Sequence, residues 1–322
     1  MYAFILRRIL ISIPVLLVAS FLLFWGVRAT FDPTARLRQV QDPGVLERER
    51  ERLGLDDPLI VQYGNWLGDF VQGDWGESAR TRDDVDTMIG RAMGNTLQLI
   101  FWGALFAAVV AVAVGVYSAV KQYSVGDYVF TGLSYLGIAM PPFWFGLMAI
   151  EFLAITPQTA WNLDEPPFLF VGLHSAGESG FNMDYVRHLV LPVLTLTVQI
   201  VASWTRFQRA GMLDVLSSDY VRTARAKGLP RRKVIYRHAL RNSLIPLVTV
   251  MAVDIGLLFG GLIVTETIFS IPGMGRLFFD SLLNGDVVVL EAWLVVVAVF
   301  VLAFNLLADV VYGLLDPRVR VA

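Results

Sequence analysis

The segment DYVRTARAKGLPRRKVIYRHALRNSLIP, residues Asp219–Pro246, is a charged stretch between two apolar ones. Residues 206–241 contain ten Lys and Arg side chains and two acids. Cations gather in the cytosolic segments of membrane proteins, so location alone explains the sign of this charge. It does not explain the order of the residues. That order predicts how the chain folds here.

The middle of this segment predicts two helices separated by a sharp turn. Residues of good helix propensity run from Tyr220 to Lys227, with Asp219 placed as an N-cap. Gly228 stands where a helix ends, and Pro230 prevents immediate continuation. A second helix can start near Arg231 and run into the next apolar stretch. We expect a rigid elbow at the membrane surface that joins two spans and can transmit force.

The composition predicts an integral membrane protein. Of the 322 residues, 56% are hydrophobic, the mean hydropathy is +0.60, and 17% are charged, compared with about 25% in soluble domains. The absence of cysteine excludes disulfides, thiolate metal sites and cysteine nucleophiles. The three histidines lie far apart in sequence, which disfavours a zinc enzyme.

Six charge-poor stretches are long enough to cross about 30 Å of hydrocarbon as helices. The first follows two arginines and resembles a signal peptide, but no small-residue cleavage site follows it, so we interpret it as a retained anchor. We expect an all-α protein with six transmembrane helices: Ile9–Val27, Asn95–Val120, Tyr128–Ile150, Leu189–Thr205, Asn242–Thr265 and Val287–Ala308.

The distribution of cations predicts that both termini are cytosolic. Arg7, Arg8, Lys121, the basic segment and Arg318 and Arg320 all fall on one side of a six-span topology. The long loop of residues 31–94 carries eight arginines and thirteen acids and falls on the other side. We divide the chain into an N-terminal helix (1–30), an extracytoplasmic region (31–94) and a membrane core (95–322), with a cytosolic loop at 206–241.

The basic segment resembles the cytosolic EAA loop of ATP-binding cassette (ABC) importer permeases. That loop has Glu-Ala-Ala, three residues, Gly, nine residues, then Ile-x-Leu-Pro. Aligning its Gly with Gly228 places Arg222, Thr223 and Ala224 at the first three positions and HALR (238–241) at the last four. The Glu and the final Pro are absent. YVRTARAKG followed by RHALRN is instead typical of the peptide and nickel branch of this family.

Three further segments are similar to the subunit with the larger exterior loop (B-type) in dipeptide and oligopeptide importers. They are LGLDDPLIVQYGNWLGDFVQGDWGES (Leu53–Ser78), ETIFSIPGMGRL (Glu266–Leu277) and LLDPRVR (Leu314–Arg320). Together with the basic loop they occur in the family's order and cover most of the chain.

The resemblance implies a type I ABC importer permease fold in a prokaryotic plasma membrane. It also implies a homologous second permease subunit, two cytosolic ATPases that bind ATP and Mg²⁺, and an extracytoplasmic substrate-binding protein. The chain itself has no GxxxxGK[ST] loop for ATP phosphates, so we expect a non-catalytic subunit that binds no cofactor or metal. Lipid is the other expected partner, and no nucleic acid is expected.

The resemblance also predicts which residues contact the ATPase. Small residues at 224, 226 and 228 would allow close approach, and the residues at 237 and 238 would brace the elbow. For each cation, contact with lipid or solvent is the alternative. The predicted coupling residues are Asp219, Tyr220, Arg222, Thr223, Ala224, Arg225, Ala226, Lys227, Gly228, Arg237 and His238.

Four residues inside the apolar stretches are candidates for the transport path. Asp254 lies midway along the fifth span, where peptide permeases often carry a neutral polar residue, and it predicts contact with an amino group or cation. An interhelical hydrogen bond is the alternative. Met140, followed by two prolines, interrupts the third span, and Gly256 and Gly260 loosen the fifth. Close helix packing is the alternative for these. Glu266 is expected at the membrane interface.

Two other functions remain open at this point. A permease for nickel chelates or another small solute would share the same motifs. An ion-coupled secondary transporter would use Asp254 and Glu151 as ion sites. Such carriers are built from inverted repeats or paired broken helices, which the sequence does not clearly show. The favoured function is a permease for di- and oligopeptides.

Overall fold

The computed structural model describes residues 2–32, 34, 44, 47, 50, 51 and 54–315, and no β-strand occurs among them. The long helices are α1 (Tyr2–Thr30), α4 (Val85–Val120), α5 (Val125–Ala139), α8 (Met183–Ser217), α11 (Leu240–Gly261) and α14 (Val287–Leu315). The short ones are α3 (Leu59–Gln72), α6 (Pro142–Ile150), η2 (Glu151–Ile155), α7 (Thr156–Ala160), α9 (Asp219–Ala226), α10 (Arg231–Lys233), η3 (Val234–Ala239), α12 (Ile263–Ile268) and α13 (Met274–Asn284).

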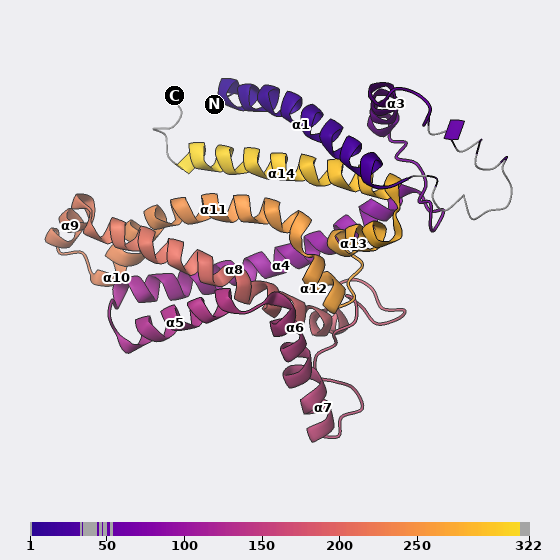
Figure 1. Ribbon diagram of the computed structural model, residues 1–322. Helices are drawn as coiled ribbons and strands as arrows, with labels where there is room; N and C mark the ends of the chain where they lie inside the picture. Colours follow the sequence, from indigo (N-terminus) through magenta and orange to yellow (C-terminus); the bar gives the residue numbers. More distant parts are fainter. Residues whose placement is uncertain are drawn as a thin grey trace.

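The long helices lie side by side and run in alternating directions along one axis (Figure 1). Within this bundle α8 packs on α4, α5 and α11, while α14 packs on α11 and α1. The short helices α9 and α10 lie at the end where α1 begins, and α3, α12 and α13 lie at the opposite end (Figure 1). The predicted all-α class is confirmed for the described residues.

The third predicted span is not one straight helix. The helix α5 ends at Ala139, and the helical segment that starts at Pro142 is bent 104° away from it. Met140 has an extended ψ of 121°, because a residue that precedes proline avoids the helical region. In the described part of the chain, five helices are long and apolar enough to cross a membrane, and this bent pair would make six.

The helix of the second span begins earlier in the chain than predicted. The helix α4 begins at Val85 rather than Asn95, so the predicted limit of the exterior region at residue 94 falls inside a helix. Asp86 and Arg91 are exposed in these first turns, while Ile89 is buried. A search for charge-free stretches missed these turns because they are amphipathic. Of the terminal motif Leu314–Arg320, residues 316–320 lie outside the described residues.

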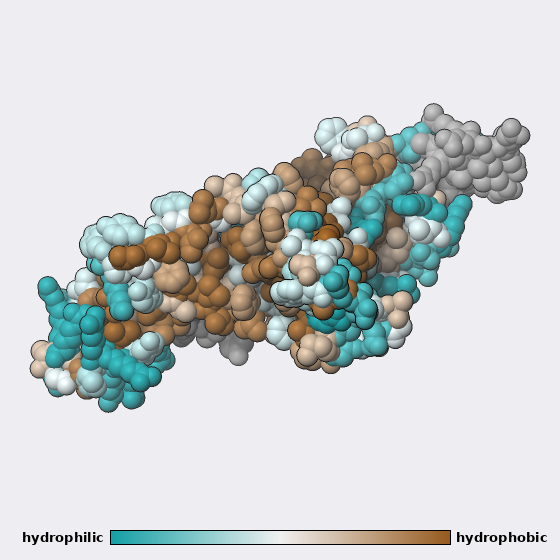
Figure 2. Space-filling model, turned by 90° about the horizontal axis from the view of Figure 1, so that it is seen from below, coloured by the Kyte–Doolittle hydropathy of each residue, from teal (hydrophilic) through white to brown (hydrophobic). Residues whose placement is uncertain are grey.

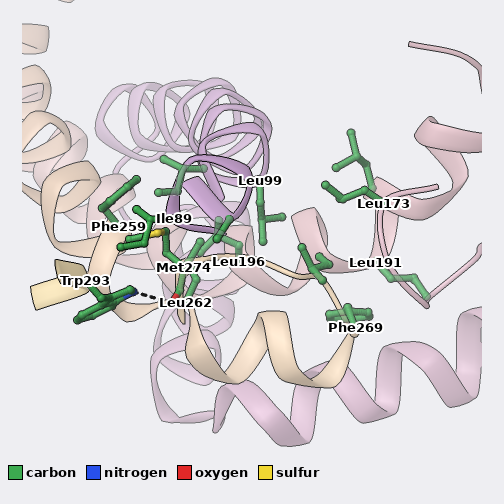
Figure 3. Packing of buried hydrophobic residues seen from close by; sticks show 14 of the residues in the cluster. Ile89, Leu99, Leu173, Leu191, Leu196, Phe259, Leu262, Phe269, Met274 and Trp293 are labelled. Carbon is green, nitrogen blue, oxygen red and sulfur yellow. Dashed lines mark hydrogen bonds between the residues drawn. The ribbon is translucent and has the colours of Figure 1, made fainter. Parts of the chain in front are cut away.

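Small residues allow α4 and α8 to pack closely. A methyl group on Gly103 would overlap the side chain of Leu196, and one on Gly115 would lie 2.7 Å from Cβ of Gln208. Figure 3 shows the main cluster of buried hydrophobic residues, where Leu99, Leu191 and Leu196 lie near residues of α11 to α14. Close packing of this kind explains how helices associate tightly where both helix and lipid are apolar.

The surface has the composition expected for a protein in a bilayer. In Figure 2 hydrophobic side chains cover the middle of the visible face, and hydrophilic side chains gather towards its two ends. In α1, Leu10 and Val18 are about three-fifths exposed, although this helix is charge-free over the stretch from Ile9 to Val27. Lipid tails, rather than water, are the suitable surroundings for such a surface.

The helix α3 packs against the C-terminal half of α1 through aromatic side chains. Tyr63 lies edge-on to Phe21 with ring centroids 5.3 Å apart, and Trp66 lies 5.3 Å from Phe24. The Tyr63 hydroxyl also forms a 2.7 Å hydrogen bond with Ser20. These contacts fix α3 on α1.

Candidate functional site

The predicted elbow is present between α8 and α11. Gly228 ends α9 with a φ of +74°, a conformation that glycine adopts without strain. Pro230 then precedes the first residue of α10, Arg231, as predicted. The expected N-cap was wrong by one residue: Ser218 occupies that position, and Asp219 lies in the first helical turn. A carboxylate there interacts favourably with the positive end of the helix dipole.

Apolar side chains hold the two arms of the elbow together. Val221, Ala224 and Val234 form a buried cluster between α9 and η3, each at most 7% exposed. Arg237 is exposed and His238 is half-buried, and neither belongs to this cluster. The contact between the arms is thus hydrophobic, and the bracing role of Arg237 and His238 stays a prediction.

The small residues of α9 face in different directions. Ala224 is buried inside the elbow against Val221 and Val234, so its small side chain serves the packing of the two arms. Ala226 is exposed at the end of α9. Tyr220 is also partly exposed, and its hydroxyl accepts a 2.9 Å hydrogen bond from Asn242 on α11. This bond provides a polar link between α9 and the following membrane helix.

The outer surface of the elbow is basic. Arg222, Arg225 and Lys227 are exposed, and Arg222 lies 3.6 Å from the carboxylate of Asp219 in a fully solvated pair. Such surface pairs contribute little to stability, so these cations are available for contacts outside the chain. Thr223 donates its hydroxyl to the carbonyl of Asp219 at 2.9 Å and stabilises the helix locally. Nine of the eleven predicted coupling residues belong to α9 and the turn that follows it, and Arg237 and His238 lie on η3, which packs on α9.

The carboxylate of Asp254 faces α8. Its Oδ2 accepts a 2.7 Å hydrogen bond from the indole Nε1 of Trp204, which is fully buried. The interhelical hydrogen bond that the sequence left open is thus formed, and it uses one oxygen of the carboxylate. Asp254 itself is half-buried.

The other path candidates lie elsewhere. A methyl group on Gly256 would lie 2.8 Å from Cβ of Phe304 on α14, and one on Gly260 would lie 3.1 Å from Val297. These contacts favour close helix packing for both glycines. Met140 lines a cavity of about 380 Å³ between α4, α5 and α8, together with Phe145 and other apolar residues.

Glu266, which the sequence places near the end of the fifth span, is a buried anchor inside the protein. Its carboxylate is fully buried, accepts the hydroxyl of Thr96 at 2.6 Å and accepts the backbone N–H of Arg276 at 2.9 Å. The Thr96 oxygen in turn accepts the N–H of Met274 at 2.8 Å. Burial raises the pKa of Glu266, while these hydrogen bonds oppose the rise.

This network explains the motif ETIFSIPGMGRL. A methyl group on Gly273 would overlap the carboxylate of Glu266, so the glycine leaves room for the acid. The spacing of acid and glycine was visible in the sequence. The burial was not, because Thr96 lies 170 residues away.

The helical bundle and the basic elbow define a multi-pass membrane protein, and its sequence identifies a transport component of the inner membrane. Residues 111–321 match the family described as binding-protein-dependent transport system inner membrane component. Residues 1–98 match the N-terminal model of the same kind of component. The chain therefore belongs to the family of inner membrane components of binding-protein-dependent transport systems.

Three curated relatives align over their full or nearly full length. The oligopeptide transport system permease protein AppB of Bacillus subtilis is 39% identical over 99% of this chain and 100% of its own length. The di/tripeptide transport system permease protein DppB of Pseudomonas aeruginosa is 38% identical over 99% of both chains. The oligopeptide transport system permease protein OppB of Mycobacterium bovis is 36% identical over 100% of both.

Proposed function

We propose that this chain is the B-type permease subunit of an ABC importer for di- and oligopeptides. The names of the relatives, all peptide transport permeases that align from end to end, carry the choice of substrate class. Nickel chelates or another small solute remain the alternative cargo in the same family. Family membership disfavours the ion-coupled carrier, since the family is that of binding-protein-dependent transport systems and its relatives are named as peptide transport permeases.

The proposed topology has six spans, with the bent pair α5–α6 as the third and both termini cytosolic. The alternating directions of the long helices support it, because α9, α10 and the start of α1 then lie at one end of the bundle (Figure 1). The Lys and Arg residues of the elbow fall at that same end, as the positive-inside rule requires of a cytosolic face.

The proposed assembly contains a second, homologous permease subunit, two cytosolic ATPases and an extracytoplasmic binding protein. This chain would form part of the path and catalyse no reaction itself, and the ATPases would hold ATP and Mg²⁺. The elbow supports the ATPase contact: α9 projects from the bundle, its inner face is packed on η3, and its outer face is basic and carries the exposed Ala226.

The experiment is ATP-driven uptake of a labelled peptide by the complete complex in proteoliposomes. Ala226→Trp and Gly228→Val should lower uptake and the ATP hydrolysis stimulated by loaded binding protein at least tenfold, because both obstruct or distort the outer face of α9. Ala160→Trp, at an exposed position at the end of α7, is the matched control. Normal uptake in both elbow variants would exclude the proposed contact.

A further inference from the structure

Asp254 differs in its partner from three other acids of the long helices. The acids Glu291, Asp127 and Asp309 each lie within 3.1 Å of an arginine nitrogen, from Arg28, Arg209 and Arg8 respectively. Asp254 has instead one neutral donor, the indole of Trp204, and no ion pair with any described residue.

The position of Asp254 is deep in the bundle. It lies fourteen residues after Leu240, which is roughly 20 Å along α11 at 1.5 Å per residue. A charged carboxylate near the middle of a bilayer is costly and is generally found facing a partner or a water-filled cavity. A single hydrogen bond does not neutralise the charge.

The side of α11 next to Asp254 is open. Val253 and Leu257 are 36% and 60% exposed, whereas Ala252 and Gly256 are buried. Asp254 therefore lies at the border between the face packed on α8 and the face that no other described part of the chain covers. Trp204 fixes Oδ2, and no described residue donates a hydrogen bond to Oδ1.

The chemistry around Oδ1 restricts the ligand that it can receive. Its neighbours on the open face are aliphatic and offer no further oxygen ligands. A cation such as Ca²⁺ needs six or more oxygen ligands, so a single carboxylate is a poor site for it. An ammonium group carries three N–H donors and a single charge, and one carboxylate with water satisfies it. Charge complementarity thus favours an ammonium ion.

We propose that Asp254 receives the cationic group of the cargo as it passes through the membrane, with Trp204 as the positioning residue that holds the carboxylate. This inference rests on the proposed peptide importer and adds a preference within the path. Peptides with a lysine side chain should pass more readily than peptides with a glutamate side chain at the same position.

The test compares uptake of Ala-Lys-Ala and Ala-Glu-Ala by the complete complex in proteoliposomes. The Lys-to-Glu uptake ratio of each variant is divided by that of the wild type, so the preference of the binding protein cancels. Asp254→Asn should lower this ratio about tenfold, and Asp254→Glu should restore most of it. Trp204→Phe should lower it by a smaller factor. Val299→Asn, a polar but uncharged change at an exposed position of α14, should leave it unchanged.

Equal loss of both peptides in Asp254→Asn, with an unchanged ratio, would show a structural role and overturn the inference. Asp254→Ser provides a second neutral variant if the asparagine complex does not assemble. Failure of the wild type to take up either peptide with ATP would refute the proposed function instead, which keeps the two conclusions separate.

Discussion

Arg28 and Glu291 form an ion pair in the interior of the protein and join the first described helix to the last. The Nε of Arg28 lies 2.8 Å from Oε1 of Glu291, and the side chains are 9% and 1% exposed. The guanidinium also donates to Gln62 at 2.5 Å and lies 4.3 Å above the ring of Phe24. The pair thus holds α1, α3 and α14 together.

Removing one member of this pair should destabilise the protein more than removing both. Arg28→Met leaves an unpaired buried carboxylate, which costs about 3–5 kcal/mol, whereas an apolar pair of similar volume is often neutral. We expect Arg28→Met/Glu291→Met to recover most of the loss. The measurement is thermal unfolding of the detergent-solubilised chain. A double variant as unstable as the sum of the single ones would show that the pairing contributes nothing.

Gly273→Ala should destabilise the protein by about 1–3 kcal/mol, the usual range for forcing extra atoms into a packed site. Its methyl group would displace the carboxylate of Glu266 from its hydrogen-bond donors. Gly132→Ala is the control, because that glycine lies exposed within α5 with open space around it. We expect it to stabilise the helix by about 0.5–1 kcal/mol. Unfolding curves that rank the two substitutions the other way would contradict the role of Gly273.

The contribution of Glu266 to stability should depend on pH. Burial raises its pKa in the folded state, so the folded protein holds the proton more tightly than the unfolded chain does. This contribution is present below the unfolded pKa and is lost as the pH rises through the raised folded value. In Glu266→Gln the side chain does not titrate. Its amide nitrogen takes the place of one carboxylate oxygen, so the network loses one hydrogen-bond acceptor.

We therefore expect Glu266→Gln to be less stable than the wild type by about 1–3 kcal/mol at low pH. The difference should shrink as the pH rises from about 4.5, the region where a free glutamate ionises. Melting temperatures of both proteins between pH 4 and pH 8 would check this. A constant difference over the whole range would show that Glu266 keeps one protonation state.

Two alanines in the elbow should respond differently to the same enlargement. Ala224→Leu overfills the cluster with Val221 and Val234 and should cost about 1–3 kcal/mol of stability. Ala226→Leu lies on the surface and should stay within about 0.5 kcal/mol of the wild type. Limited proteolysis should cleave the elbow of Ala224→Leu faster than that of the wild type and leave the cleavage rate of Ala226→Leu unchanged. Equal cleavage of the two would contradict the assigned packing.

Much of the fold follows from local sequence. Charge-poor stretches located α1, α8, α11 and α14 because charged side chains are costly in hydrocarbon and therefore rare within spans. Gly228 and Pro230 fixed the turn of the elbow because their backbone preferences are intrinsic. The two prolines after Met140 signalled an interruption but did not reveal its size, since the 104° angle depends on what α6 packs against.

The features that the sequence did not predict involve residues whose partners lie far away in sequence. The buried network of Glu266 is one of them, because Thr96 donates its hydroxyl from another helix. The position of Ala224 in the family's loop suggested a surface for a partner, yet Val234 covers it. Local patterns predict which residues form helices. They do not predict which face of a short helix another segment covers.

The break between α5 and α6 has a mechanical consequence. Two consecutive prolines, at 141 and 142, remove two consecutive amide donors, so the segment lacks the continuous hydrogen bonding that makes a helix stiff along its axis. An axial push on α5 from the basic end would not be transmitted as an axial push on α6. The start of α5 is tied to α8 through the pair of Asp127 and Arg209, whereas α6 packs on α8 and α12, so separate contacts hold the two halves of the bent pair.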